Sequence, residues 1–390
     1  MKSLTKLSIA LAPMMGVFAS AQAAEPITLA DGITMHITGQ VTMRSESNVL
    51  LRESNEDSDL SFDYTPGLEL NIGKSGVTDL NGVVSYRYHI IEFSDNHSLD
   101  SRNDDFKTNL VYSNANFVAK GHLSYVELQT NQDVAELTSG GLLTIEPGRV
   151  SRSIINASAY GEMSISPKTK IGTGISYVRQ NYIESLGYND VAKMVVPVDL
   201  YLAVSPKTDF IVGASYGSLM LGDSNSSDAN DFNLNVGVRG ELMPKLHGSA
   251  RVGWMSRDGR SIEDQDGISF DADLKYDLTP LSTLTLRGMR DLSASSTSSQ
   301  TTTRTGIIGY ADFRLASVFQ AGGNLGYIKT EYEDASGRDD DYMMAGAYVG
   351  YIPNEYVNVK LSYSYKDNDS NYNSVDYNNN VLEVVASFRY

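Results

Sequence analysis

The chain has 390 residues, of which 31 are basic and 48 acidic, and its formal net charge is −17. This negative surplus excludes nucleic acid as a natural partner, because phosphate binding requires basic side chains. The sequence holds no cysteine, which is compatible with folding outside the cytoplasm without disulfides.

The first residues have the pattern of a secretory signal peptide. Two lysines precede an apolar core over residues 7–18, and Ala21-Gln22-Ala23 supplies a small-x-small cleavage site. We therefore predict cleavage near Ala23, so that residues 1–23 are the signal peptide. Residues 24–32 are expected to form a short periplasmic segment.

From residue 33 onward the chain alternates between apolar and polar residues. No stretch has the 18 successive apolar residues of a membrane helix, and the mean hydropathy is −0.25. A barrel strand shows lipid only every second residue, so a membrane barrel looks polar on average. The apolar faces of the clearest strands are Ile33/Met35/Ile37/Val41/Met43, Leu60/Phe62/Tyr64/Leu68/Leu70/Ile72, Leu80/Val84/Tyr86/Tyr88/Ile90, Phe232/Leu234/Val236/Val238/Leu242 and Ile268/Phe270/Ala272/Leu274/Tyr276/Leu278.

Short and long connections alternate between these strands, and together they predict 18 strands. The short turns lie near 73–79, 114–116, 165–169, 204–208, 242–246, 277–282, 315–319 and 352–356. The long polar connections lie near 47–59, 92–105, 129–148, 180–190, 218–230, 256–267, 291–302, 331–341 and 366–377. Prolines recur in five of the short turns, and Ser166-Pro167-Lys168-Thr169 is repeated as Ser205-Pro206-Lys207-Thr208. Each period corresponds to one hairpin of two strands of about ten residues.

The sequence therefore predicts an all-β fold over residues 33–390, a transmembrane antiparallel up-and-down β-barrel in the bacterial outer membrane. Short turns and both termini face the periplasm in such barrels, and long loops face outward. The residues before position 33 are too few for a plug domain, so we expect a water-filled lumen. Lipid and lipopolysaccharide are the expected surroundings. The acidic residues of the long loops, such as Asp104, Asp105 and Asp339 to Asp341, are interpreted as a solvated face or as ligands for cations that bridge to lipopolysaccharide.

Basic residues within the strands indicate the lumen, because Arg or Lys costs about 2–4 kcal/mol at the lipid midplane. The candidate pore-lining residues are Arg44, Arg87, Lys120, Arg239, Arg251, Lys275, Arg287, Arg304 and Lys360. Acidic residues share the same face, so these charges either hydrate the wall or form a lane of donors and acceptors for a hydrated, even anionic, polymer. Tyr160, Tyr310 and Tyr351 are further candidates for inward-facing positions.

Nothing in the sequence indicates an enzyme. Four of the five histidines are spread along strands, and no Gly-x-Ser-x-Gly elbow, His-Glu-x-x-His or paired ligand spacing occurs. We accordingly predict no catalytic residues, no cofactor and no metal site.

The last strand carries the expected insertion signal. Its even-numbered residues from Leu382 to Tyr390 are apolar, and it ends on Tyr390 with Phe388 two residues before. We expect Phe388 and Tyr390 to be read by the barrel assembly machinery. We also expect residues 33–46 to pair with 378–390.

The C-terminal two-thirds, about residues 60–390, resembles the putative β-barrel porin 2 family. The features are Leu-x-Leu strands joined by Ser-Pro-Lys-Thr turns, the segment Leu284 to Asp291, a serine-rich loop, and the motifs Thr301-Thr302-Thr303-Arg304, Arg338-Asp339-Asp340-Asp341-Tyr342 and Tyr363-Ser364-Tyr365. Arg290 and Asp291 match the arginine–acid pair of the family, at the loop end of a strand. They are expected to brace the mouth or to form a rim salt bridge.

The resemblance implies an outer-membrane channel for a secreted exopolysaccharide or capsule polymer, working with a periplasmic polysaccharide export protein. The alternative is a passive porin for small sugars, acids or other nutrients. Porins usually narrow the lumen with an inward-folded loop, and 129–148 is the candidate by length.

Overall fold

The structure is a computed structural model that describes residues 26–74, 76–130, 149–183, 188–222, 229–260, 262, 264–295, 301–333, 337–372 and 375–390. No helix in these ranges has the length and apolarity to cross a bilayer. The strands are β1 (Ile27–Ala30), β2 (Ile33–Glu46), β3 (Asp59–Ile72), β4 (Leu80–Phe93), β5 (Ser101–Ser113), β6 (Phe117–Thr130), β7 (Arg149–Ser166), β8 (Thr169–Tyr182), β9 (Val191–Ser205), β10 (Thr208–Leu221), β11 (Ala229–Met243), β12 (Leu246–Gly259), β13 (Gln265–Thr279), β14 (Ser282–Ala294), β15 (Thr301–Arg314), β16 (Phe319–Tyr332), β17 (Asp339–Tyr351), β18 (Val357–Ser370) and β19 (Tyr377–Arg389), with one 3-10 turn, η1 (His97–Leu99).

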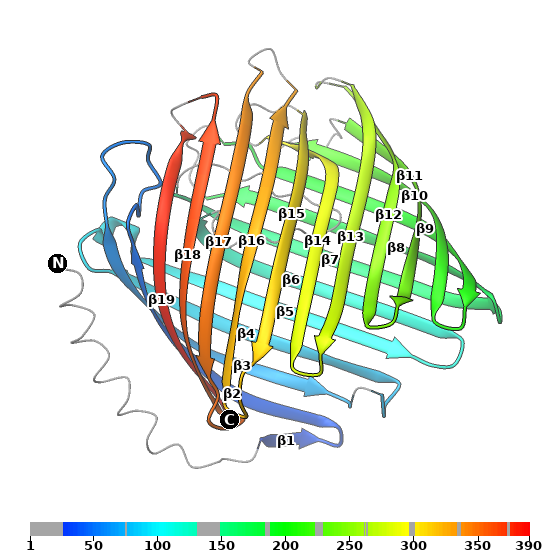
Figure 1. Ribbon diagram of the computed structural model, residues 1–390, viewed down its shortest axis with the longest axis horizontal. Helices are drawn as coiled ribbons and strands as arrows, with labels where there is room; N and C mark the ends of the chain where they lie inside the picture. The colour runs from blue at the N-terminus through cyan, green and yellow to red at the C-terminus, as the bar shows by residue number, and fades with distance from the viewer. Residues whose placement is uncertain are drawn as a thin grey trace.

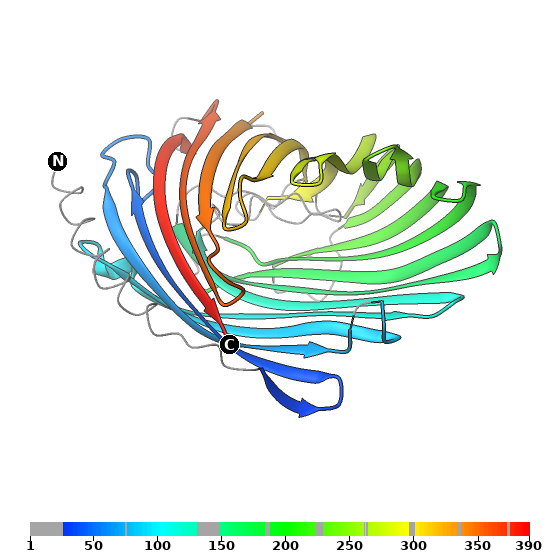
Figure 2. The same cartoon turned by 60° about the horizontal axis from the view of Figure 1, so that its bottom comes forward.

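The strands form a closed antiparallel barrel (Figures 1 and 2). Each strand from β2 to β19 pairs with the next one along the chain, and β19 pairs back onto β2. The predicted 18-stranded barrel is confirmed. The short strand β1 was not predicted. It pairs only with the first residues of β2 and lies outside the ring.

The seam between β2 and β19 closes the barrel where the alternation predicted it. Val381 to Arg389 pair with residues 46 down to 38. At its periplasmic end Phe388 lies opposite Gly39, and a Cβ at Gly39 would stand 2.1 Å from the Phe388 ring. The ring therefore occupies the space that a side chain at position 39 would need. This is the aromatic covering of a strand glycine that stabilises sheets.

The strands are longer than expected, with 13 to 18 residues in place of about ten. The turns lie at the predicted places, but the ladders continue past the bilayer toward the outside. Several acidic residues predicted to lie in loops therefore lie in strand ends: Asp104 and Asp105 in β5, Glu331 in β16, and Asp339 to Asp341 in β17. Charged side chains do not prevent backbone pairing once the strand has left the hydrocarbon, because water solvates them there.

The outer face of the barrel is apolar with aromatic residues toward both ends, as membrane barrels require. Near the short turns Phe319 lies beside Tyr351, with 5.1 Å between ring centroids. Toward the other end, Phe232 lies edge-on to Trp254. Figure 1 shows β1 and the C-terminus at the same end of the barrel as the short turn between β13 and β14.

Candidate pore-lining site

Contacts between strands that are not neighbours identify the inner face of the wall. The Arg239 guanidinium on β11 donates to both carboxylate oxygens of Glu162 on β7, at 2.7 and 2.8 Å. Strands four apart in a curved sheet approach each other only on the concave side. Arg239 and every residue of its parity on β11 therefore point into the barrel.

The inner face of β7–β14 carries charged and hydroxyl side chains in three layers, which we call the polar lane. Its members, from the periplasmic end outward, are Glu162, Lys170, Asp209 and Arg239; then Tyr160, Asp199, Tyr201 and Arg251; then Lys193, Asp231, Arg257 and Asp291.

In the periplasmic layer two cations face two carboxylates. Arg239 reaches Asp209 at 2.9 Å as well as Glu162, and Lys170 lies 3.2 Å from Asp209. The guanidinium of Arg239 also stacks on the Tyr201 ring, 3.4 Å from its centroid. A planar guanidinium can make both kinds of contact at once. This layer is electrically balanced.

The middle layer combines an ion pair with two tyrosine hydroxyls. Arg251 donates to both oxygens of Asp199, at 2.7 and 3.3 Å. The Tyr201 hydroxyl donates to Asp199 at 3.0 Å, and the hydroxyls of Tyr160 and Tyr201 lie 2.5 Å apart. Hydrogen bonds to a charged acceptor are the stronger kind, so Asp199 fixes the positions of its neighbours.

The extracellular layer is the most deeply buried. Arg257 forms a two-point pair with Asp231 at 2.6 and 2.8 Å. Lys193 lies 3.1 Å from Asp231 and 3.7 Å from Asp291, and it also donates to the Leu292 carbonyl oxygen at 3.0 Å. Asp231 therefore holds two cations, while Asp291 has one distant cation and accepts a hydrogen bond from the Leu292 N–H at 2.8 Å.

A cavity of about 410 Å³ lies against the middle and extracellular layers of the polar lane. It is lined by residues of β9 to β14 together with Ser176 of β8, and most of those that point inward are polar. They include Asn233 and Asn235 on β11 and Ser269 and Asp271 on β13. The Asn233 amide donates to the Ser269 hydroxyl at 2.7 Å, and the Asn235 amide donates to Asn233 at 2.9 Å.

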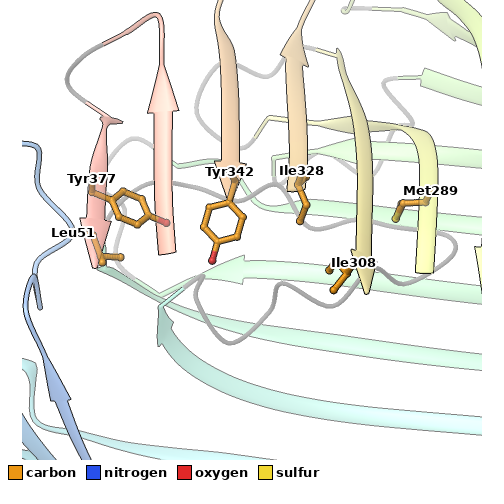
Figure 3. Close-up of a cluster of buried hydrophobic side chains, with 6 residues drawn as sticks. All are labelled: Leu51, Met289, Ile308, Ile328, Tyr342 and Tyr377. Carbon is orange, nitrogen blue, oxygen red and sulfur yellow. The ribbon is translucent and has the colours of Figure 1, made fainter. Parts of the chain in front are cut away.

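Farther round the barrel the inner face carries a cluster of buried apolar and aromatic side chains beside polar ones such as Arg304. Six buried residues form what we call the apolar patch: Leu51, Met289, Ile308, Ile328, Tyr342 and Tyr377 (Figure 3). Five of them stand on strands, and Leu51 comes from the connection between β2 and β3. A second buried cluster takes Ile262 from the connection between β12 and β13. These two connections pack onto the extracellular part of the barrel. The predicted narrowing loop, 129–148, falls almost entirely outside the described residues.

The other candidate pore-lining residues lie on the same strand face as the polar lane. Arg44 pairs with Glu383 across the seam at 2.9 Å, and Arg287 lies 3.4 Å from Asp273. Lys275 is 3.8 Å from Asp277. The rest share this parity: Arg87 and Lys120 are exposed, Lys360 is half-buried and Arg304 is buried. That these nine residues border a conducting path stays a prediction.

Two other expectations need adjustment. Arg290 and Asp291 do not contact each other, because neighbouring strand residues point to opposite faces. Arg290 reaches Thr305 at 2.6 Å and Glu331 at 3.3 Å, whereas Asp291 faces Lys193 inside. The expected inward placement of Tyr351 is wrong, because its ring pairs with Phe319 on the exposed apolar face.

Lys193 and Arg257 were missed by the sequence reasoning. Arg257 falls in the range 256–267, which was predicted to be a loop, yet β12 continues through it. Its parity is that of Arg251, so extending the alternation by a few residues would have found it. Lys193 has the parity of Asp199 on β9 and was detectable in the same way.

Comparison with known proteins agrees with this fold. No curated protein matches the chain. The model of the family described as Putative beta-barrel porin 2 matches residues 219–390, which confirms the resemblance over that range.

Among solved structures, a BenF-like porin from Pseudomonas fluorescens Pf-5 superimposes with a TM-score of 0.51 and 7% identity, covering 93% of this chain and 100% of the porin. OccK2 (OpdF) of Pseudomonas aeruginosa, solved with glucuronate, gives a TM-score of 0.50 and 12% identity over 92% of this chain and 98% of that one. A bacterial polysaccharide outer membrane secretin scores 0.36 with 10% identity, over 91% and 98% of the two chains. Identities this low carry the fold alone.

The closed sheet, its apolar exterior and its charged inner wall define a class. This protein is a porin-like outer-membrane barrel, and its architecture is that of a channel.

Proposed function

We propose that the barrel conducts a secreted polysaccharide, an exopolysaccharide or capsule polymer, to the cell surface. The observation that supports this proposal is the polar lane, which runs through three layers along β7–β14. Its charges are paired within the wall, from Arg239 with Glu162 to Arg257 with Asp231. A wall of paired charges, hydroxyls and amides offers many exchangeable hydrogen bonds, which suits a hydroxyl-rich chain that must keep moving.

The turns at the periplasmic rim offer a docking surface for a periplasmic polysaccharide export protein. Three turn lysines at this rim, Lys168, Lys207 and Lys245, each follow a proline and would present positive charge to such a partner. Lys207 is neutralised by Glu241 at 2.5 Å, and Lys245 donates to the Leu278 carbonyl oxygen at 3.1 Å. Among the described residues Lys168 has no carboxylate partner. Lys168 and Lys245 therefore supply most of the unpaired positive charge of these turns. The barrel assembly machinery and lipopolysaccharide are further proposed partners.

Deletion of the gene tests the proposal in the cell. Surface polysaccharide should disappear while its synthesis continues inside, and the wild-type gene should restore it. Complementation with Lys168→Glu and Lys245→Glu together should restore barrel abundance but not full export, because an acidic partner would be repelled. Lys207→Glu alone is the matched control. Normal surface polysaccharide in the deletion strain would refute export.

The second candidate is a passive porin for small sugars, acids or other nutrients. It is favoured by the connections that carry Leu51 and Ile262, which pack inward at the extracellular end and so narrow the mouth. The fold likeness to OccK2, a protein solved with glucuronate, points the same way. Liposomes containing the purified barrel should then swell in isotonic sugar, and the deletion strain should lose uptake of one small solute.

A further inference from the structure

We propose that the cavity between β9 and β14 is a binding site for a sugar unit that carries a positive charge, such as an amino sugar. The inference rests on the proposed function only in taking a carbohydrate as the solute. The cavity of about 410 Å³ falls within the range of about 300–1,000 Å³ that is usual for sites of small ligands.

The lining has the donors and acceptors that hydroxyl groups need. The Asn233–Ser269 and Asn235–Asn233 hydrogen bonds hold two amides in place at the cavity wall, and the Asn235 oxygen also accepts from Arg251 at 3.3 Å. Ser215 and Ser249 add hydroxyls, which can both donate and accept. Met255 and Met289 supply adaptable apolar surface for a ring face.

The charge of the lining decides which sugar fits. The side chains that point into the cavity carry four carboxylates and two cations: Asp199, Asp231, Asp271, Asp291, Lys193 and Arg251. Both cations are already occupied. Arg251 is held by Asp199 at two points, and Lys193 lies between Asp231 and the Leu292 carbonyl oxygen.

Asp271 is the group left over. It lies directly opposite Arg251 in the strand register, but Arg251 turns toward Asp199. Asp271 makes no ion pair or hydrogen bond in the part of the chain that the structure describes, although it is half-buried. Asp291 stands nearby; it accepts from the Leu292 N–H at 2.8 Å, and its cationic partner Lys193 is 3.7 Å away. An ammonium group would supply the missing counter-charge, whereas a carboxylate would be repelled.

Three sugars with the same ring test the charge requirement. Glucosamine, N-acetylglucosamine and glucuronate are titrated into the purified full-length barrel in detergent at neutral pH, and binding heats are measured. Glucosamine should bind most tightly, N-acetylglucosamine more weakly and glucuronate least. Added salt should weaken only the binding of glucosamine. Equal or tighter binding of glucuronate would overturn the inference.

A matched pair of variants tests the location. Asp271→Asn should weaken glucosamine binding about tenfold, because the ammonium group then meets a neutral amide oxygen in place of a carboxylate, while N-acetylglucosamine binding should be nearly unchanged. Asp273→Asn removes a carboxylate of the same strand face that pairs with Arg287 outside the cavity. It should leave all three affinities as they are. If both variants weaken glucosamine binding equally, the lumen acts through its overall charge and the site does not exist.

These outcomes are separable from the fate of the export proposal. Selective binding that depends on Asp271, together with normal surface polysaccharide in the deletion strain, would leave the site standing and refute export. If deletion abolishes surface polysaccharide but glucuronate binds as well as glucosamine does, the export proposal stands and the proposed sugar site is refuted.

Discussion

The polar lane and the apolar patch occupy the same inner face of one sheet, yet they are built differently. The lane keeps cations in the wall by pairing each with a carboxylate, so that even Arg257, whose side chain is 0% exposed, has two contacts with Asp231. The patch removes water altogether: Ile308 is 0% and Ile328 1% exposed.

The difference shows that the inside of this barrel is not uniformly wet. A buried ion pair costs desolvation free energy and is a poor source of stability. Burial of apolar side chains does stabilise. The patch therefore gives the connection that carries Leu51 a surface to rest on, and it meets the polar lane on β14, where Met289 and Asp291 stand two residues apart.

The largest effect is expected at the seam, because neither region forms unless the sheet closes. Phe388→Ser with Tyr390→Ser should leave the barrel unassembled in the periplasm, since both aromatic anchors of the last strand are lost. Heat-modifiable electrophoresis of outer-membrane fractions measures the folded band.

The matched control is Phe319→Ser with Tyr351→Ser. This pair is also exposed at the short-turn end and lies away from the seam. It should assemble at near-normal abundance. A normal folded band for the seam variant would show that the last strand is not the signal.

The next effect comes from breaking the polar lane. Arg257→Ala leaves Asp231 buried with Lys193 alone, and loss of one partner of a buried pair costs about 3–5 kcal/mol of unfolding free energy. Urea titration of the refolded barrel in lipid vesicles measures the loss. Arg102→Ala, which removes an exposed rim pair with Glu92, should cost about 0–1 kcal/mol. Similar costs for the two variants would mean that the lane is not a buried network.

A somewhat smaller loss is expected in the apolar patch. Ile308→Ala should destabilise the barrel by about 2–4 kcal/mol, because a cavity is left in the apolar patch. Ile307→Ala serves as the comparison, since Ile307 is the next residue and is 49% exposed on the outer face. Equal losses at the two positions would contradict a packed patch.

The smallest effect on stability is expected at the extracellular rim. Arg290→Ala should change the unfolding free energy by at most about 1 kcal/mol, because its pair with Glu331 is partly exposed on the outer face. Asp291→Asn should be similarly mild in stability but should shift the cation-to-anion permeability ratio in planar bilayers, because Asp291 faces inward. A shift caused by Arg290→Ala instead would place that residue in the lumen.

Strand number, turn positions and the pairing of the two end strands could be read from the sequence, because a two-residue period and proline-bearing turns are local signals. Strand length could not. The ladder of β5 continues through Asp104 and Asp105, where side-chain polarity indicates a loop although backbone pairing does not depend on it. The inward placement predicted for Tyr351 was wrong for a related reason, since a tyrosine near the membrane–water interface suits either face of a strand.

The site was predictable as a face but not as a set of contacts. Parity placed Arg239 and Arg251 on one wall, but which carboxylate each meets depends on barrel curvature, which brings β7 within reach of β11. The inward packing had only a weak sequence signal: Leu51 ends the short apolar run Val49-Leu50-Leu51 in a polar connection, and Ile262 is a lone apolar residue in another.

The fit of the Phe388 ring over Gly39 has a consequence for the order of events. The two residues stand 349 positions apart, on the first and last strands of the ring. Phe388 is among the last residues to be synthesised and exported. Until it has crossed the inner membrane, no aromatic ring can cover Gly39 on the first strand. Closure therefore requires the complete last strand. A prematurely terminated chain leaves the edge of β2 unpaired and exposed to periplasmic proteases, whereas β19 of the complete chain pairs with that edge.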